Sequence, residues 1–299
     1  MQAFQTVGIV GKRRDPHVTP TLLTLLETLR ELGRNVIVED ATLPGHPLPA
    51  GVERRPRAGL IGCDVVIVVG GDGTLLSAGR DLAAASVPII GINQGRLGFM
   101  VDVRPEQMRE TLAEIFAGDC VREQRLLLQA RLLRQNGSEG APLLAVNDVV
   151  IRNQAAIRML EFETWLDGEF ISQHRADGLV IASPTGSTAY ALSGGGPVIH
   201  PSIDAITLVP ICPHTLSDRP IVVSARQTVR ITLRGDADTV AMFTCDSQTA
   251  ATLRAGDSFE VGAADVRLNL VHPRGYSYFN ILRNKLHWGR GPLTSDPPC

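Results

Sequence analysis

A glycine-rich segment with one carboxylate, Gly70-Gly71-Asp72-Gly73-Thr74, directly follows the apolar run Val65–Val69. Glycines let a phosphate approach backbone N–H groups, and a helix that begins near Leu75 would favour an anion at its start. A carboxylate in such a cradle repels phosphate unless it holds Mg²⁺ or accepts a proton from an attacking hydroxyl. Both uses belong to phosphoryl transfer. The alternative is a turn at Asp72-Gly73 in which Asp72 caps the helix.

Two further stretches carry polar groups suited to a nucleotide. Small hydroxyl residues and glycines fill the stretch from Asp177 to Pro197, and Tyr190 offers a ring on which a base can stack. Asn147-Asp148 follows a short apolar run, and an amide beside a carboxylate suits vicinal ribose hydroxyls. The alternatives are a Ser/Gly-rich loop that caps a helix and an ordinary turn pair.

The common phosphate-binding motifs are missing. Lys12 follows Gly11, but Arg13 stands where a P-loop needs Ser or Thr. Gly71-x-Gly73 lacks the third glycine of the dinucleotide fingerprint, so a dehydrogenase-type cofactor site is not expected. Lys12 and Lys285 are the only lysines in the sequence.

Alternating strands and helices are predicted for the first third of the chain. Strands are expected at 7–10, 35–39, 65–69 and 87–92, and helices at 21–32, 75–85 and 106–116. Gly33 is expected to end the first helix. Repeated β-α-β units predict a doubly wound parallel sheet, in an N-terminal α/β domain of residues 1–120.

The middle of the chain has short alternating stretches and few helices, which favours a mostly antiparallel β domain at 121–271. Residues 228–233 and 240–244 flank Gly235-Asp236 and are expected to form a hairpin. Residues 272–290 are expected to pack back on the first domain through a helix near 277–286. The tail 291–299 is expected to be frayed. The predicted fold class is thus α/β, with a parallel-sheet domain followed by an antiparallel β domain.

Composition narrows the classes of partner. The chain has 299 residues, 44% of them hydrophobic, and a net charge of −2, which excludes a disordered chain and gives no basic field for nucleic acid. No apolar run approaches the ~18 residues of a membrane span. The five cysteines form no C-x-x-C pair, which favours a reduced, cytoplasmic protein. The histidines show no metal-ligand spacing.

Together these stretches resemble the NAD kinase family, closest to its enterobacterial type, nearly from end to end. The glycine loop alone is weak, because lipid kinases and phosphofructokinases have similar loops, but its combination with Thr185–Tyr190 is specific. The stretches that carry the resemblance are 8–11, 70–74, 91–93, 97–99, 147–148, 177–193, 213–216 and 276–280.

The resemblance implies transfer of the γ-phosphoryl group of ATP to the 2'-hydroxyl of the adenosine of NAD, with Asp72 as proton acceptor and Mg²⁺ or another divalent cation accompanying ATP. It also implies a homodimer or homotetramer. The phosphate loop would be Gly70, Gly71 and Thr74. The dinucleotide contacts would be Gly73, Phe99, Asn147, Asp148, Arg158, Arg175, Asp177, Thr188, Ala189, Tyr190, Ala191, Leu192, Ser193 and Gln248.

Two positions depart from the family pattern, because Asp148 stands where Glu is usual and Arg158 where the enterobacterial type has His. Three alternative functions stay open at this point. They are a lipid kinase with the same glycine loop, a non-catalytic NADP(H)-binding sensor, and an NADP phosphatase. No membrane and no nucleic acid is expected as a partner.

Overall fold

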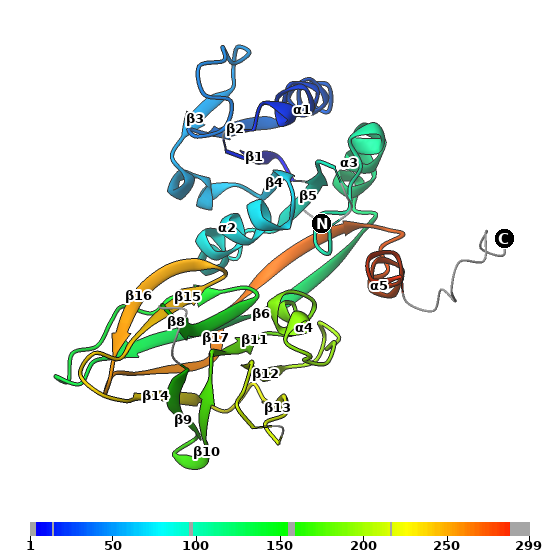
Figure 1. Cartoon of the computed structure of the whole chain (residues 1–299). Helices are drawn as coiled ribbons and strands as arrows, with labels where there is room; N and C mark the ends of the chain where they lie inside the picture. The colour runs from blue at the N-terminus through cyan, green and yellow to red at the C-terminus, as the bar shows by residue number, and fades with distance from the viewer. Residues whose placement is uncertain (1–3, 14, 96–97, 155–158, 216, 288–299) are drawn as a thin grey trace. The chain divides into compact units, whose positions relative to one another are not determined.

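The computed structural model describes residues 4–13, 15–95, 98–154, 159–215 and 217–287 (Figure 1). The chain divides into two compact units, one of Met1–Glu123 with Asn269–Cys299 and one of Gln124–Leu268. The expected domain boundaries near residues 120 and 271 stay predictions. The tail 291–299, expected to be frayed, lies outside the described residues.

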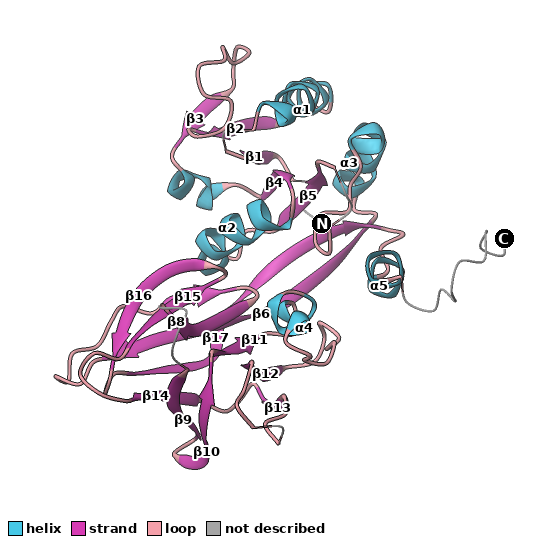
Figure 2. Ribbon diagram, viewed as in Figure 1, coloured by secondary structure: helices cyan, strands magenta, loops and turns pink. Residues whose placement is uncertain are grey.

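Helices alternate with strands in the N-terminal part of the chain, whereas strands predominate from β6 to β17 (Figure 2). The helices are α1 (Thr19–Glu31), α2 (Asp72–Leu82), α3 (Met108–Ala117), α4 (Tyr190–Ser193) and α5 (Tyr278–Leu286). The strands are β1 (Thr6–Gly11), β2 (Asn35–Glu39), β3 (Glu53–Arg55), β4 (Val65–Gly70), β5 (Ile89–Asn93), β6 (Cys120–Leu133), β7 (Leu143–Ala145), β8 (Asp148–Asn153), β9 (Leu160–Leu166), β10 (Glu169–Ala176), β11 (Gly178–Ala182), β12 (Ala205–Ile211), β13 (Ile221–Ser224), β14 (Val229–Arg234), β15 (Val240–Cys245), β16 (Gln248–Arg254) and β17 (Ser258–Pro273). No helix among the described residues is long and apolar enough to cross a membrane.

The first unit contains a parallel sheet in the order β5-β4-β1-β2-β3, and the end of β17 pairs with β5 at Leu270 and Ile89. The strand order reverses at β1, since β2 and β3 lie on one side of it and β4 and β5 on the other. Every residue of β4 is buried, as its unbroken apolar sequence predicts for a strand covered on both faces. Side chains of α1 and α3 share one hydrophobic cluster with alternate residues of these strands. The predicted α/β class with a parallel sheet is confirmed.

Helix α2 begins at Asp72, three residues before the predicted start at Leu75. Gly71 precedes it with an extended backbone, and its carbonyl accepts hydrogen bonds from the N–H groups of Thr74 and Leu75. The sequence prediction was late because it relied on the first apolar residue, and Asp72-Gly73-Thr74 carries no apolar side chain. The glycine-rich segment is therefore the end of β4 and the first turn of α2.

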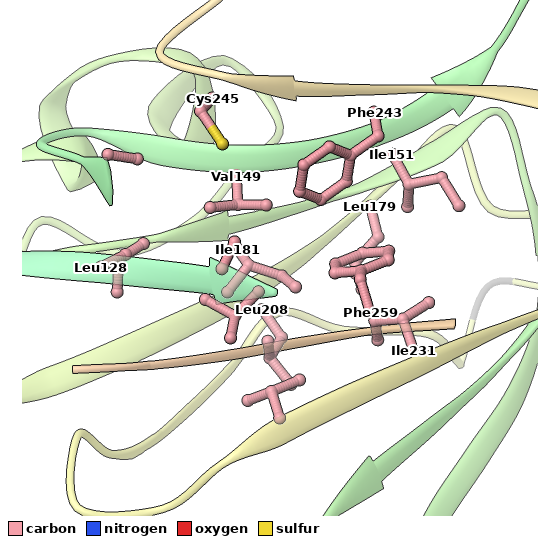
Figure 3. Close-up of a cluster of buried hydrophobic side chains, with 14 of the residues drawn as sticks. Leu128, Val149, Ile151, Leu179, Ile181, Leu208, Ile231, Phe243, Cys245 and Phe259 are labelled. Atoms are coloured by element: carbon pink, nitrogen blue, oxygen red, sulfur yellow. The ribbon is translucent and has the colours of Figure 1, made fainter. Parts of the chain in front are cut away.

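The second unit is a sandwich of two mainly antiparallel sheets. One contains β10-β9-β14-β17 together with β6 and β7, and the other has the order β13-β12-β11-β8-β15-β16. Apolar side chains from both sheets pack against one another, and Figure 3 shows several of them, including Val149, Leu179, Phe243 and Phe259. Phe243 and Phe259 meet edge to face with ring centroids 4.9 Å apart. The predicted antiparallel β region is confirmed.

The hairpin predicted around Gly235-Asp236 is wrong. β14 pairs with β9 and β17 in one sheet, whereas β15 pairs with β8 and β16 in the other. The chain thus passes from one sheet to the other between these strands. Alternation of side chains identifies each strand, but it does not identify the strand's partner, and this caused the error.

Candidate functional site

The carboxyl ends of three neighbouring parallel strands carry the first group of candidate residues. Lys12 follows β1, Gly70 ends β4 and Asn93 ends β5. The N–H of Lys12 donates to the carbonyl of Val69 at 3.0 Å, and the N–H of Gln94 donates to the carbonyl of Gly70 at 3.0 Å. This edge lies where the strand order reverses, which is the usual ligand position in an open α/β sheet.

Asp72 does not cap its own helix. Its Oδ2 accepts a hydrogen bond from the N–H of Phe99 at 2.8 Å, and its Oδ1 accepts one from the N–H of Met100 at 3.0 Å. The helix-capping alternative is therefore wrong, because the N-cap residue is Gly71, which has no side chain to bond to the first turn. Each oxygen retains a lone pair beyond these bonds. The two hydrogen bonds fix the orientation of the carboxylate, and because Asp72 is only half-buried, a ligand can still reach it.

The glycines of this segment have different reasons to lack a side chain. A Cβ added at Gly70 would lie 2.7 Å from Oγ1 of Thr74, so close packing inside the protein requires glycine there. At Gly71 and Gly73 an added Cβ would meet no described atom within 4 Å, and neither has a positive φ. The fold does not require glycine at those two positions, and their backbone is left open on that side. Phe99 is half-buried, with Nζ of Lys285 5.9 Å from its ring centroid.

A second group of candidate residues lies in the second unit, where Asn147 directly precedes β8 and Asp148 begins it. The turn between β15 and β16 consists of Asp246 and Ser247, both with positive φ, as in a two-residue hairpin of the primed type. The carboxylate of Asp246 accepts hydrogen bonds from the N–H groups of Val146 at 2.9 Å, Asn147 at 2.7 Å and Asp148 at 3.2 Å. The hairpin turn thus fixes the backbone of the Asn-Asp pair.

Asp148 has a strongly raised pKa. Its side chain is buried, with the residue 4% exposed, and it lies near the carboxylate of Asp246. Burial, and secondly the charge of Asp246, raise the pKa of Asp148 to about 7. The carboxylate of Asp246, which accepts the three N–H hydrogen bonds, is the nearby charge that adds to the effect of burial on Asp148. Near neutral pH this carboxyl can donate or accept a hydrogen bond.

The segment after β11 packs directly on Asn147. The N–H of Ser183 donates to the carbonyl of Asn147 at 2.8 Å, and the Ser183 hydroxyl donates to the carbonyl of Val146 at 2.5 Å. A Cβ at Gly186 would overlap the carbonyl oxygen of Asn147, so only glycine permits this approach. The hydroxyl of Ser187 donates to the carbonyl of Pro184 at 2.6 Å and accepts from the N–H of Ile199 at 3.0 Å. Ser183, Gly186 and Ser187 are therefore structural supports.

The predicted adenosine-binding segment is presented by the short helix α4 and the turn before it. Tyr190 is 41% exposed and Ser193 is exposed, while Thr188, Ala189 and Leu192 are half-buried. Ala191 differs, because it is fully buried in a cluster with Val150, Val180 and Val209. Its methyl group supports the segment by packing, and its role as a ligand contact stays a prediction.

The remaining predicted residues lie in two other places. Gln248 is exposed and begins β16, directly after the Asp246-Ser247 turn, so it belongs with the Asn147 group. Asp177 is exposed at the opposite end of the β8–β11 pair, where the N–H of Asn153 donates to its carbonyl, and Arg175, also exposed, lies two residues earlier near the end of β10. Five strand residues separate this end from Asp148, or about 17 Å.

Arg175 forms an ion pair with Glu161 at 3.1 Å and lines a cavity of about 1050 Å³ with Met159, Arg234 and Asp236. Arg158, which departs from the family pattern, lies outside the described residues. The sequence thus predicts residues that the structure distributes over three locations.

Two residues of these clusters were missed by the sequence analysis. Asp246 organises the Asn-Asp pair, and the available signal was an Asp-Ser pair between two alternating stretches. Asn93 is buried beside Gly70, and within the described residues its Oδ1 has no hydrogen-bond partner while its Nδ2 donates to the carbonyl of Gly95 at 2.9 Å. The sequence analysis included Asn93 only as part of the stretch 91–93 that carries the family resemblance, and it gave this asparagine no role.

Comparison with known proteins identifies the family. The model of the ATP-NAD kinase N-terminal domain matches residues 7–120, and that of the ATP-NAD kinase C-terminal domain matches residues 146–273. The chain is 46% identical to NAD kinase from Chromohalobacter salexigens over 291 residues, covering 96% of this chain and 98% of that one. It is 44% identical to NAD kinase from Pseudomonas entomophila, covering 97% of each.

Solved structures share the architecture. An NAD kinase from Archaeoglobus fulgidus in complex with ATP matches with a TM-score of 0.74 and 25% identity, covering 95% of this chain and 99% of that one. Yeast NADH kinase complexed with NADH matches with a TM-score of 0.90 and 23% identity, covering 99% and 91%, and shows the fold alone. The family matches set aside the lipid-kinase alternative. The chain belongs to the ATP-NAD kinase family, whose reaction is the phosphorylation of NAD to NADP.

Proposed function

We propose that this chain transfers the γ-phosphoryl group of ATP to the 2'-hydroxyl of the adenosine of NAD, with Asp72 as the general base. The hydroxyl oxygen bonds to the γ-phosphorus as the bond from that phosphorus to the β,γ-bridging oxygen breaks. The hydroxyl proton passes to Asp72, and the products are NADP and ADP. General-base assistance of this kind is worth ~10²- to 10⁴-fold in rate.

The observation that carries this proposal is the position of the Asp72 carboxylate. The N–H groups of Phe99 and Met100 hold both oxygens and leave each a lone pair for a hydroxyl proton. Packing inside the protein does not require glycine at Gly71 or Gly73, since an added Cβ would meet no described atom within 4 Å. The exposed backbone at these two positions supports the close approach of a phosphate. A base and a phosphate cradle therefore share one strand-to-helix turn.

The second unit supports recognition of the nucleoside. We propose that Asn147 and Asp148 bind ribose hydroxyls, since together they donate and accept. Tyr190 is proposed to stack on a base, which its exposed ring permits, and Thr188, Ala189, Leu192 and Ser193 to line the same segment. Gln248, Arg175 and Asp177 are proposed as further dinucleotide contacts.

We propose that Mg²⁺ arrives with ATP and is held by its phosphate oxygens and by water. Among the described residues, no group of three or more His, Cys, Asp or Glu side chains is arranged to hold a metal ion, and we assign no protein ligand to it. The ion would offset charge on the phosphate oxygens. We also propose a homodimer or homotetramer, which light scattering coupled to size-exclusion chromatography would test.

The variant Asp72→Asn tests the proposed base. The amide keeps the size of the side chain and retains one acceptor oxygen, so NAD binding by calorimetry is expected to persist. Turnover is expected to fall at least 100-fold, because an amide does not accept the proton. Asp81→Asn is the matched control, since Asp81 lies on the same helix and its side chain pairs with Arg57 at the surface. Wild-type turnover in Asp72→Asn would refute the proposal.

A further inference from the structure

A charged cluster in the first unit, centred on the buried His272, has no role in the mechanism above. His272 is 1% exposed, and its ring lies between two carboxylates. Its Nδ1 is 2.9 Å from Oδ2 of Asp102, and its Nε2 is 3.2 Å from Oε2 of Glu123. Tyr276 stacks on the imidazole with ring centroids 3.8 Å apart, and its hydroxyl donates to Glu123 at 3.3 Å.

Both ring nitrogens face carboxylate oxygens, and a proton on each nitrogen gives two charge-assisted hydrogen bonds. A neutral imidazole has one N–H, so one of its nitrogens would direct a lone pair at a carboxylate. Burial alone lowers the pKa of His272, but the hydrogen bonds and charges of Asp102 and Glu123 outweigh burial and raise it. Among the described residues, the titratable groups against the ring are Asp102 from the turn after Met100, Glu123 from β6, and Tyr276 after β17.

The cluster is joined to Asp72 through one short turn. Phe99 and Met100, whose N–H groups hold Asp72, lie three and two residues before Asp102, respectively. The Oδ2 of Asp102 bonds to His272, and within the described residues its Oδ1 is buried without a hydrogen-bond partner. Loss of the proton from His272 removes the positive charge between the two carboxylates and leaves one ring N–H to share between them, which is costly in this partly buried cluster. The carboxylate of Asp102 would then move toward solvent and displace the turn.

We propose that His272, held between Asp102 and Glu123, is a positioning residue that fixes the turn whose backbone orients Asp72. The proposal rests on the role proposed above for Asp72. Since the pKa of His272 is raised, the cation is fully present below its ordinary pKa of ~6.5 and is lost as pH rises through the raised value. Turnover therefore falls on the alkaline side as the cluster loses this proton.

The test measures kcat and both KM values from pH 6 to 10 for the wild type and four variants. His272→Gln removes the cation and is expected to lower kcat about 10- to 100-fold with KM changed less than threefold, because it misplaces Asp72 without touching substrate. Glu123→Gln keeps the histidine and a hydrogen-bond acceptor but removes one charge. It is expected to move the alkaline fall of kcat to lower pH, an effect that loss of packing would not produce.

His174→Gln is the matched control, since His174 pairs with Asp218 at 3.1 Å in the second unit and is expected to leave kcat and its pH profile unchanged. Asp72→Asn in the same series separates the two proposals. If Asp72→Asn is inactive but the alkaline limb of Glu123→Gln coincides with that of the wild type, the positioning role is refuted alone. If Asp72→Asn is active, the proposed base is refuted. Should His272→Gln fail to fold, the profile of Glu123→Gln decides.

Discussion

Replacing Asp148 by Asn should stabilise the protein, and increasingly so as pH rises. Burial and the nearby charge of Asp246 raise the pKa of Asp148 from 3.8 to about 7. A raised carboxyl pKa means that the folded protein binds the proton more tightly than the unfolded chain does. Folding is therefore favoured at low pH and loses free energy as pH rises from the unfolded pKa to the folded pKa. Asn has nearly the same shape and no charge, so the variant escapes this loss.

The size of the effect follows from the shift. The pKa of Asp148 rises by about three, and each pKa unit corresponds to about 1.36 kcal/mol, so the free energy of unfolding changes by about 4 kcal/mol in total. The part lost between pH 5 and pH 8 is about 2–3 kcal/mol, because the rest is already lost between the unfolded pKa of 3.8 and pH 5. A loss of that size is a large fraction of the ~5–15 kcal/mol that stabilises a typical protein. A buried carboxylate that weakens the fold is typical of a residue kept for binding.

Urea unfolding at pH 5, 6, 7 and 8 measures this difference. The free energy of unfolding of Asp148→Asn minus that of the wild type is expected to grow by about 2–3 kcal/mol over this range. Titration of His272 and other groups is common to both proteins and cancels in the difference. A difference that is constant with pH would refute the argument that Asp148 carries a proton in the folded protein near neutrality. The NAD affinity of the variant, measured in parallel, should be reduced.

Three other outcomes are expected. Gly98→Ala places a Cβ onto the Asp72 carboxylate and should lower kcat more than it raises KM, whereas Gly62→Ala, whose Cβ meets no described atom within 4 Å, should be neutral by steady-state assay. Tyr190→Ala should raise the KM for NAD about 3- to 10-fold by losing ring stacking; Tyr190→Phe should stay near the wild type, and an equal effect of both would refute stacking. Removal of divalent cations with EDTA should stop turnover and added Mg²⁺ restore it, while NAD binding persists by calorimetry.

Several elements could be predicted from the sequence because their signals are local. The unbroken apolar run of β4 predicted a strand covered on both faces, and leucines at helical spacing predicted α1. Gly33 follows that helix with a positive φ of 67°, as its predicted stop requires. The start of α2 was misplaced because the first turn of that helix carries no apolar residue.

The sequence by itself determined the strand-glycine-acid-helix order around Asp72, the change from parallel to antiparallel architecture, and the family. Only the tertiary structure decided that Asp72 bonds to the turn at Phe99 instead of capping its helix. It also decided that Asp246 organises Asn147 and Asp148, and that Asp177 lies at the other end of β8, about 17 Å from Asp148. The physical reason is the distance along the chain over which each kind of signal acts. Residue type and periodicity describe neighbours along the chain, whereas hydrogen bonds, burial and charge depend on residues that are brought together from distant segments.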